Sequence, residues 1–410
     1  MAGQLAIDGG PKTRTTPFPP WPALGPEDVE AVADILRSGR LTQLTGPAVA
    51  EFEKACADWH GVAHCVATSS GTTAIHCALA ALGVGPGDEV IVPAHTFIAS
   101  ATPVLHLGAT PVFADVDERT FCIAPESVAE GVTERTKAIV AVHLNGHPAD
   151  LDALQEIARP RGIAVVEDAA QAHGALYDGR KVGTIGVLGC FSFWEDKIVT
   201  TGGEGGCVIT DDAALAERMR RFRHHGEGPA EGAQTGGRPP ERAYYHLDLG
   251  YNFRMTSMQA ATGLVQFRRL EEYLAARRRN AAYLSERLGE LGPIEPPFVA
   301  DYATHSYYKY ICRLRREAVP STPAGAGLRT GIDIARFVAA VAAEGLPISR
   351  RYPTPLPQQP VFRDRGLAPA DCPVSERLAG ELFTLLAHPT VTTADLDDYV
   401  TAISKVLSAA

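Results

Sequence analysis

Apolar and polar residues alternate between residues 62 and 210 in a pattern that predicts an α/β fold. Short β-branched runs, which are typical of buried strands, are separated by segments with helical spacing. In order, the segments are EVIVPA, ASATPVLHLGA, TPVFADV, TKAIVAVHL, DLDALQEIARPRG, IAVVEDAA, CFSF and GCVIT. Because strands that alternate with helices build mostly parallel sheets, we expect functional residues in the loops that follow the strands.

The second half of the chain contains longer helical patterns. Their spacing predicts a helix over 212–225 and a long helical region over 257–288. Loops rich in Pro and Gly interrupt this half, with the sequences GEGPAEGAQTGGRPPER, AVPSTPAGAGLRTG and YPTPLPQQP. We therefore expect a large domain over 1–265, including an N-terminal arm, and a smaller C-terminal domain over 266–410.

The composition is that of a globular protein with a large core. The chain has 410 residues, of which 45% are apolar and 21% charged, and two domains are expected for this length. The formal net charge is -10 and the pI is about 5.7. Because nucleic acids attract basic surfaces, this balance argues against nucleic acid as the main partner.

The cysteines and the uncharged segments indicate the cellular compartment of the protein and whether the chain crosses a membrane. Eight cysteines without a CxxC pair give little support for a zinc site or a disulfide framework, so we predict no metal and a reducing compartment. The first residues lack the continuous apolar segment of a signal peptide. Prolines interrupt the longest uncharged span, 90–114, which therefore predicts buried strands and loops, not a membrane span. We expect a cytoplasmic protein with no membrane partner.

The stretch CFSFWEDKIVTTGGEGG, residues 190–206, holds a single lysine, Lys197, between an apolar run and a glycine cluster. Apolar neighbours would take this lysine partly out of water, which disfavours its charged form and makes the amine a better nucleophile. A lysine considered alone more often points into solvent from a loop. Other segments must decide between these interpretations.

Two segments could hold a phosphate. In SSGTTA, residues 69–74, small hydroxyl residues surround Gly71 just before a helical run. Backbone amides at such a helix start, together with the hydroxyls of Thr72 and Thr73, could bind a phosphate, although a simple N-capped helix also explains them. Ser192 in FSFWEDK is a possible second phosphate ligand.

Further candidates follow two other predicted strands. Phe97, in the loop PAHTFIAS, could stack on a flat ring, or it could pack in the core. Glu167 and Asp168 come directly after a buried apolar strand, and a buried carboxylate needs a partner such as a protonated heterocyclic nitrogen. Gln171, three residues after Asp168, could hydrogen-bond a neighbouring ring oxygen.

The segment LGYNFRMTSMQAA places Asn252 and Arg254 at the start of a predicted helix. They could contact an anion, and an ordinary N-terminal turn explains them equally well. Taken together, a phosphate cradle, a stacking ring, a carboxylate for a pyridine nitrogen and a lysine for a Schiff base describe a site for pyridoxal 5'-phosphate (PLP).

The ordered set of motifs resembles the fold-type I aminotransferases of the DegT/DnrJ/EryC1/StrS group, which aminate keto sugars and keto cyclitols. The resemblance covers nearly the whole chain. It rests on SGRLTQLTGPAVAEFEKACADWHG, SSGTTA, TFIAS, VHLNGHPAD, VEDAAQAHGA, SFWEDK, GGEGG and GYNFRMTSMQAA. It implies a large domain with a mostly parallel central sheet and a smaller C-terminal α+β domain.

The resemblance also implies a role for each candidate. Lys197 would be the Schiff-base lysine and the proton-transfer base, and Asp168 would be the partner of the pyridine nitrogen. Gln171 would contact the ring hydroxyl, and Phe97 would stack on the ring. The phosphate would be bound by Gly71, Thr72, Thr73 and Ser192. Asn252 and Arg254 would reach the site of a neighbouring subunit, which implies a homodimer with shared active sites. The expected reaction moves an amino group from L-glutamate or L-glutamine to a keto sugar or keto cyclitol.

Two other functions compete with the aminotransferase. A PLP-dependent dehydratase or lyase of the same fold would release water without transferring nitrogen, and relatives of that kind replace the lysine with histidine. A PLP-binding regulator would hold the cofactor without turnover. One departure from the family pattern concerns the acceptor: Pro357 stands where many members that use nucleotide sugars carry histidine. Together with the opening LAIDGGPKTRTTPFPPWP, it favours a keto cyclitol or an unactivated keto sugar.

Overall fold

A computed structural model describes residues 4–228, 245–315, 333–367 and 371–409. Most of the predicted loop over 226–242 and all of the one over 318–331 lie outside the described residues. None of the helices in the described parts of the chain combines the length and the apolarity that a bilayer crossing needs.

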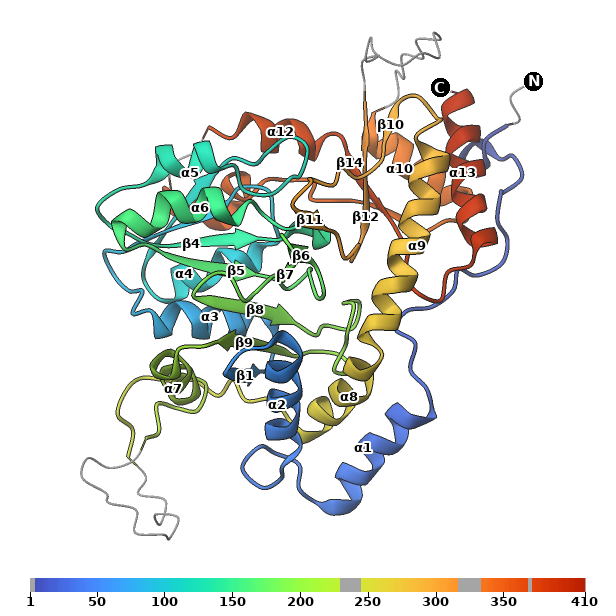
Figure 1. The fold of residues 1–410 in the computed structure, drawn as a ribbon. Helices are drawn as coiled ribbons and strands as arrows, with labels where there is room; N and C mark the ends of the chain where they lie inside the picture. Colours follow the sequence, from blue (N-terminus) through green and yellow to red (C-terminus); the bar gives the residue numbers. More distant parts are fainter. Residues whose placement is uncertain (1–3, 229–244, 316–332, 368–370, 410) are drawn as a thin grey trace.

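A seven-stranded sheet forms the centre of the larger part of the molecule (Figure 1). Its order is β1-β9-β8-β5-β4-β2-β3, and only β9 runs antiparallel to its neighbours. The strands are β1 (His64–Thr68), β2 (Glu89–Pro93), β3 (Thr110–Ala114), β4 (Thr136–Val142), β5 (Ala164–Asp168), β8 (Leu188–Ser192) and β9 (Gly206–Thr210). The predicted α/β architecture with a mostly parallel sheet is confirmed.

Helices pack around this sheet because their apolar faces need a partner (Figure 1). They are α2 (Ala48–His60), α3 (Gly71–Ala81), α4 (Thr102–His106), α5 (Pro125–Gly131), α6 (Leu151–Ala158) and α7 (Ala213–Phe222). The predicted helix over 212–225 corresponds to α7. It begins after Asp212, whose carboxylate accepts hydrogen bonds from the backbone N–H groups of Ala214 and Leu215.

A second hydrophobic core lies under an antiparallel sheet of order β10-β12-β14-β13. Its strands and covering helices are β10 (Ile294–Glu295), β12 (Tyr310–Leu314), β13 (Ile348–Arg350), β14 (Leu382–Leu385), α10 (Ile334–Ala343) and α13 (Thr393–Ser408). The predicted helical region over 257–288 consists of α8 (Ser257–Arg268) and α9 (Leu270–Leu288), which join the two parts. The domain division between residues 265 and 266 stays a prediction.

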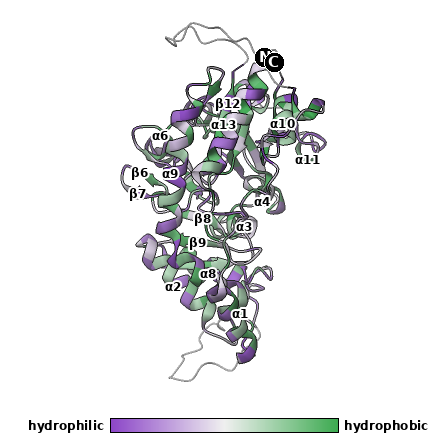
Figure 2. Ribbon diagram, turned by 90° about the vertical axis from the view of Figure 1, so that its right-hand side faces the viewer, coloured by the Kyte–Doolittle hydropathy of each residue, from purple (hydrophilic) through white to green (hydrophobic). Residues whose placement is uncertain are grey.

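The remaining elements lie at the edges of the two parts. They are β6 (Leu176–Tyr177), β7 (Arg180–Lys181), β11 (Ala303–Thr304), α1 (Pro26–Ser38), α11 (Pro360–Arg363) and α12 (Pro373–Ala379). Figure 2 shows α1 at one end of the molecule, next to α8. The two helices are linked where Gln266 Nε2 donates to Asp28 Oδ1 at 2.6 Å.

The N-terminal arm crosses the second core before it reaches α1. The buried carboxylate of Glu344 accepts hydrogen bonds from the backbone N–H groups of Ala6 and Thr13, both at 2.9 Å. Further along, Trp21 Nε1 donates to the backbone carbonyl of Lys197 at 2.9 Å. The arm therefore connects the C-terminal core to the segment that carries the lysine singled out above.

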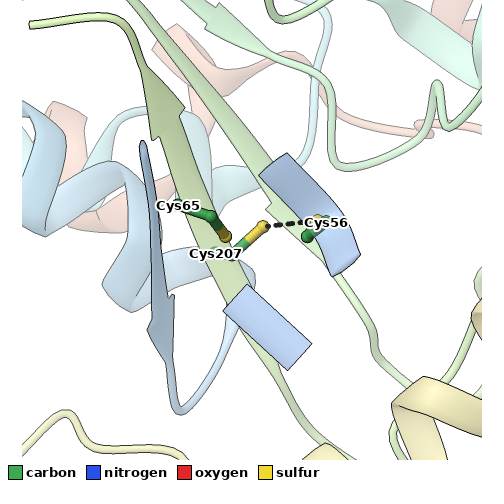
Figure 3. Close-up of side chains that lie close together, drawn as sticks. All are labelled: Cys56, Cys65 and Cys207. Carbon is green, nitrogen blue, oxygen red and sulfur yellow. Dashed lines mark hydrogen bonds between the residues drawn. The ribbon is translucent and has the colours of Figure 1, made fainter. Parts of the chain in front are cut away.

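Three cysteines that are distant in the sequence meet in the core of the larger part (Figure 3). Cys56 of α2, Cys65 of β1 and Cys207 of β9 place their Sγ atoms within 4.8 Å of one another, and the Cys56 and Cys207 sulfurs are 3.7 Å apart. The sequence spacing did not indicate this cluster, because the pairing of β1 with β9 creates it. All three thiols are buried and pack as small apolar groups.

We expect the native protein to resist thiol reagents. All eight cysteines are free and buried, so a reagent cannot reach their sulfur atoms. Only the thiolate reacts, and burial raises the pKa of Cys77 and Cys122 to about 12, whereas a hydrogen bond with Cys207 lowers the pKa of the buried Cys56. Intact-mass measurement after a brief treatment with an alkylating reagent should show no added groups. The same treatment in denaturant should add eight. Rapid labelling of the native protein would contradict the packing described.

Candidate active site

Lys197 lies in the turn that follows β8, with its side chain inside the protein. Only 9% of the residue is exposed. Its Nζ atom lies 4.4 Å from the ring centroid of Tyr308. Its backbone is held on both sides, because its N–H donates to the carbonyl of Trp194 at 2.9 Å and its own carbonyl accepts from Trp21. The amine is therefore held in position, and it is not a solvent-facing loop lysine.

The surroundings of Lys197 lower the pKa of its amine from 10.5 to about 7. Burial is the largest cause, since the charged form loses its hydration. The positive charge of Arg351 acts in the same direction, and the carboxylates of Asp168 and Asp196 oppose it. A large fraction of Lys197 is consequently neutral and nucleophilic near pH 7.

A cavity of about 460 Å³ opens at the Lys197 side chain. It is lined by Ser70, Gly71, Thr72, Ile75, Phe97, Ala99, Asp168, Ala170, Gln171, Ser192, Trp194, Lys197, Glu204, Tyr308, Arg351 and Tyr352. Seven of the residues predicted from the sequence therefore meet in one place. These are Gly71, Thr72, Phe97, Asp168, Gln171, Ser192 and Lys197.

The start of α3 forms one wall of this cavity. Ser70 caps the helix, and its Oγ atom accepts the N–H of Thr73 at 3.2 Å. The Thr73 hydroxyl is hydrogen-bonded to the Ser70 backbone, and Thr73 does not line the cavity. Gly71 is required by close packing, since a Cβ atom there would lie 2.6 Å from the Cβ of Ser192. The helix start and Ser192 are thus brought together as a compact polar corner.

Two adjacent carboxylates at the end of β5 have different surroundings. Asp168 lines the cavity, and its carboxylate accepts hydrogen bonds from Ser100 Oγ at 2.7 Å and from the N–H of Ala170 at 3.1 Å. Among the described residues, Asp168 makes no ion pair. Glu167 points away from the cavity and accepts from His143 Nε2 at 2.9 Å and from three backbone N–H groups. Asp168 is therefore the carboxylate that remains free for a ligand.

Gln171 and Phe97 are arranged together with Tyr352. Gln171 Oε1 accepts the N–H of Asn145 at 3.0 Å, and its Nε2 atom donates to the Tyr352 hydroxyl at 3.2 Å. The rings of Phe97 and Tyr352 are 6.3 Å apart, and Phe97 is 54% exposed. Phe97 is therefore not a core residue in this chain, and its open ring face can accept a flat partner.

Asn252 and Arg254 do not line the cavity of their own chain. Their segment runs behind the α3 loop, where the Ser69 N–H donates to the carbonyl of Phe253 at 2.8 Å. Arg254 Nη1 lies 2.7 Å from His224 Nδ1. Asn252 and Arg254 therefore lie outside the cavity of their own chain, and their role at the site of a neighbouring subunit stays a prediction.

Comparisons with known proteins agree with this geometry. The sequence pattern of the DegT/DnrJ/EryC1/StrS aminotransferase family matches residues 22–404. The chain belongs to the DegT/DnrJ/EryC1/StrS aminotransferase family. Its members are PLP-dependent enzymes.

Two curated relatives and one solved structure illustrate the similarity. The chain is 40% identical to the GDP-perosamine synthase of Caulobacter vibrioides, with 88% of this chain and 91% of that protein covered. It is 36% identical to the L-glutamine:2-deoxy-scyllo-inosose aminotransferase of Streptomyces kanamyceticus, with 99% and 97% covered. An aminotransferase structure from Psychrobacter cryohalolentis matches with a TM-score of 0.87 and 36% identity, with 96% and 99% covered.

We expect PLP capture by this aminotransferase to follow the unusual pKa of Lys197. The neutral amine is the reactive form, so the rate at which the cofactor-free protein binds PLP should rise up to about pH 7 and then level off. Stopped-flow absorbance over a series of buffers measures this rate. An ordinary lysine would show a rate that keeps rising through about pH 9, and that result would contradict the buried environment of the amine.

The residues of the cavity that were not singled out in the sequence include Tyr308, Arg351 and Glu204. Tyr308 lies within THSYYKYICRL, and its neighbours His305, Tyr307 and Lys309 do not line the cavity. Lys309 instead pairs with Asp196, at 2.6 Å between Nζ and Oδ2. Tyr308 lies in a bend just before β12, so strand periodicity does not predict the direction of its side chain. Nothing in the local sequence around Arg351 or Glu204 predicts that they line the cavity, because loops that are distant in the sequence place them there.

Proposed function

We propose that this aminotransferase moves an amino group from L-glutamate or L-glutamine to a keto sugar or keto cyclitol, and that Lys197 is its catalytic lysine. The observation that carries the proposal is the cavity itself, in which a buried lysine with a pKa of about 7 shares the space with the unpaired carboxylate of Asp168. A buried carboxylate and a buried amine are both costly unless a ligand compensates them. We infer that PLP is this ligand.

The residues of the cavity fit PLP. Asp168 offers a negative charge for a protonated pyridine nitrogen, and Gln171 lies three residues further on, at the same wall. The backbone at Gly71 and the hydroxyls of Thr72 and Ser192 form a polar corner for a phosphate. When bound, the cofactor supplies an electron sink for negative charge that develops on the donor carbon.

Lys197 then serves in two ways. Its neutral amine would hold the cofactor covalently, by condensation with the cofactor's aldehyde and loss of water. After a donor displaces it, the same Nζ atom can accept the proton from the donor α-carbon and return a proton in the reverse half of the cycle. Both tasks require an amine that is not permanently charged, which the burial of Lys197 supplies.

The proposed acceptor class follows the relatives, whose names include a perosamine synthase and several deoxy-scyllo-inosose aminotransferases. Pro357, which stands where many nucleotide-sugar members carry histidine, is buried and does not line the cavity. The apolar ring of Pro357 therefore offers no hydrogen-bonding side-chain group to a nucleotide. We favour a keto cyclitol or an unactivated keto sugar.

The decisive experiment records the visible absorbance of the PLP-loaded protein before and after addition of L-glutamine or L-glutamate. Loss of the lysine-linked cofactor band, followed by its return on addition of a keto cyclitol or keto sugar, would support the proposal. Product analysis that shows loss of water without nitrogen transfer would favour a dehydratase. A cofactor band that no donor changes would favour a regulator.

We further propose a homodimer with shared active sites. Large apolar side chains are exposed on and around α1 and near Asn252 in the chain, and they include Leu24, Val29, Leu36 and Leu249, at 53, 68, 56 and 87%. Exposed apolar side chains of this size are typical of subunit interfaces. Leu249 lies three residues before Asn252, so a second copy could receive this segment.

A complementation experiment tests the shared site. Lys197→Ala and Arg254→Ala chains with different tags are co-expressed, and the heterodimer is isolated. If each site uses residues of both chains, one intact site forms and about half of the wild-type activity returns. No recovery above the Arg254→Ala homodimer would place the whole site in one chain.

The cytoplasmic location also stays a proposal, and the eight free cysteines favour a reducing compartment.

A further inference from the structure

The carboxylate next to Lys197 in the chain binds a different lysine. Asp196 Oδ2 lies 2.6 Å from Lys309 Nζ, and the two side chains are 30% and 9% exposed. A contact this short is a charge-assisted hydrogen bond, which is stronger than a hydrogen bond between neutral groups. Lys197 itself makes no ion pair with any of the described residues. Asp196 is therefore engaged by Lys309 and not by its neighbour in the chain.

Lys309 reaches Asp196 from the other part of the molecule. It immediately precedes β12, a strand of the second core, whereas Asp196 lies in the turn that follows β8. The ring of Tyr308 is near both amines, with its centroid 4.4 Å from Lys197 Nζ and 5.2 Å from Lys309 Nζ. The packing of the two parts thus places a second buried cation close to Lys197.

Asp196 and Lys309 act on the Lys197 amine in opposite directions. Burial and the charge of Arg351 lower the pKa of Lys197. Lys309 acts with them, whereas Asp168 and Asp196 raise this pKa. While Asp196 and Lys309 are paired, their opposite charges largely cancel at Lys197. Without Lys309, the full negative charge of Asp196 would act on Lys197 and favour its ammonium form.

Other titratable groups also face the two lysines, from several elements. Around Lys197, on β5 and on loops next to β5, β9, β12 and β13, they are Asp168, His173, Glu204, Tyr308 and Arg351. Around Lys309 they are Arg277, Tyr308, Arg351 and His388. Within the described ranges, none of them forms an ion pair with Asp196 or Lys309. Lys309 is therefore the cation that sets how much of the Asp196 charge acts on Lys197.

We propose that Lys309 is a positioning residue that holds the Asp196 carboxylate in an ion pair of its own and thereby keeps the Lys197 amine neutral and ready to bind PLP. The inference rests on the proposed aminotransferase function, in which Lys197 binds the cofactor. It adds a residue that prepares this lysine. Lys309 does not line the cavity, so it acts through Asp196 and not by touching the cofactor.

The first experiment measures how the rate of PLP capture by the cofactor-free protein depends on pH, by stopped-flow absorbance. The midpoint, at which half of the plateau rate is reached, should lie near pH 7 in the wild type, as the pKa of Lys197 indicates. Lys309→Met should raise the midpoint by about one pH unit and slow capture at pH 7 by about fivefold, because less of Lys197 is neutral.

Two further variants separate an electrostatic role from a structural one. Asp196→Asn should lower the midpoint, because it removes a charge that favours the ammonium form of Lys197. Lys309→Met combined with Asp196→Asn removes both charges and should return the midpoint to within about half a pH unit of the wild type. Loss of a purely structural contact would instead impair all three variants alike. Asp196→Asn also keeps the test valid if Lys309→Met does not fold.

Two control variants complete the series. Lys309→Arg keeps the positive charge and should keep the wild-type midpoint. Lys405→Met breaks a comparable pair in the second core, in which Lys405 Nζ lies 2.8 Å from Glu344 Oε2. It should lower stability without moving the midpoint, because Glu344 is not among the charges that act on Lys197.

The outcomes separate the inference from the function on which it rests. Borohydride reduction followed by peptide mapping shows whether PLP is bound to Lys197. If it is, an unchanged midpoint in Lys309→Met, a raised midpoint in Asp196→Asn, or no return in the combined variant would overturn the role of Lys309 and leave the aminotransferase intact. Absence of PLP from Lys197 in the reduced wild type would overturn the proposed function, and the inference with it.

Discussion

Replacement of Lys197 by alanine is expected to lower transamination by about 10⁴-fold, because it removes both the anchoring amine and the proton-transfer base. No other amine of the described residues lines the cavity to replace it. Lys309 also lies near the Tyr308 ring, with its Nζ atom 5.2 Å from the ring centroid, but its ammonium group is paired with Asp196. The loss is measured as steady-state turnover with a keto acceptor and confirmed by the missing lysine-linked absorbance band.

Two controls make this result specific. Lys54→Ala changes an exposed lysine that pairs with Asp58 on α2, and it should retain wild-type turnover. A small primary amine added to Lys197→Ala should restore part of the proton transfer, because the cavity left by the side chain can admit it. Turnover within about tenfold of the wild type in Lys197→Ala would refute the assigned role.

Replacement of Asp168 by asparagine is expected to lower turnover by about 10³-fold with little change in stability. The amide keeps the shape of the side chain and can still accept from Ser100, but it carries no negative charge to stabilise a protonated pyridine nitrogen. The electron-sink property of the cofactor depends on that proton. Steady-state kinetics and thermal unfolding of the cofactor-free variant measure the two effects separately.

The adjacent carboxylate supplies the matched control. Burial raises the pKa of Glu167, but the His143 hydrogen bond and the backbone N–H groups of Gly183 and Gly186 more than offset it, so the pKa is lowered overall. Glu167→Gln turns an amide NH₂ toward those donors and should cost about 3 kcal/mol of unfolding free energy. Once the variant is folded and loaded, its turnover should stay near that of the wild type. Equal kinetic losses at both positions would contradict the division between them.

The pH dependence of stability follows from the same groups. The folded-state pKa of Lys197 lies below its unfolded value of 10.5, so the unfolded chain binds more protons between about pH 7 and 10.5. This residue therefore adds stability as the pH rises through that window. Lys197→Ala lacks this contribution, so the unfolding free energy of the wild type, measured over this pH range, can be compared directly with that of the variant.

Much of the site could be predicted from the sequence because its parts follow directly from local pattern. Short apolar runs predict buried parallel strands, and a polar residue at the end of such a run must lie at the edge where ligands bind. Asp168 and Lys197 were found in this way. The small residues of SSGTTA likewise predict a helix start, and α3 begins there.

Other features depended on contacts between segments far apart in the chain. Local pattern alone could not distinguish Glu167 from Asp168, and only the family resemblance chose Asp168. The partner of Glu167 is His143 on the neighbouring strand connection, and its other donors follow residue 182. Thr73 was predicted beside Thr72 as a phosphate ligand, but the helix cap engages its hydroxyl. Neighbouring residues of one motif can face different surroundings, since helix and strand geometry turn successive side chains in different directions.

The sequence by itself determined the fold class and the family, and it pointed to Lys197 and Asp168 as the proposed reacting groups, because each is encoded in local periodicity or in an ordered set of motifs. Only the tertiary structure decided the low pKa of Lys197 and the presence of Arg351 and Glu204 in its cavity. Burial and Coulomb interaction depend on distance in space. The loop after β13 lies more than 150 residues from Lys197 in the chain, yet it carries the charge that acts on the lysine.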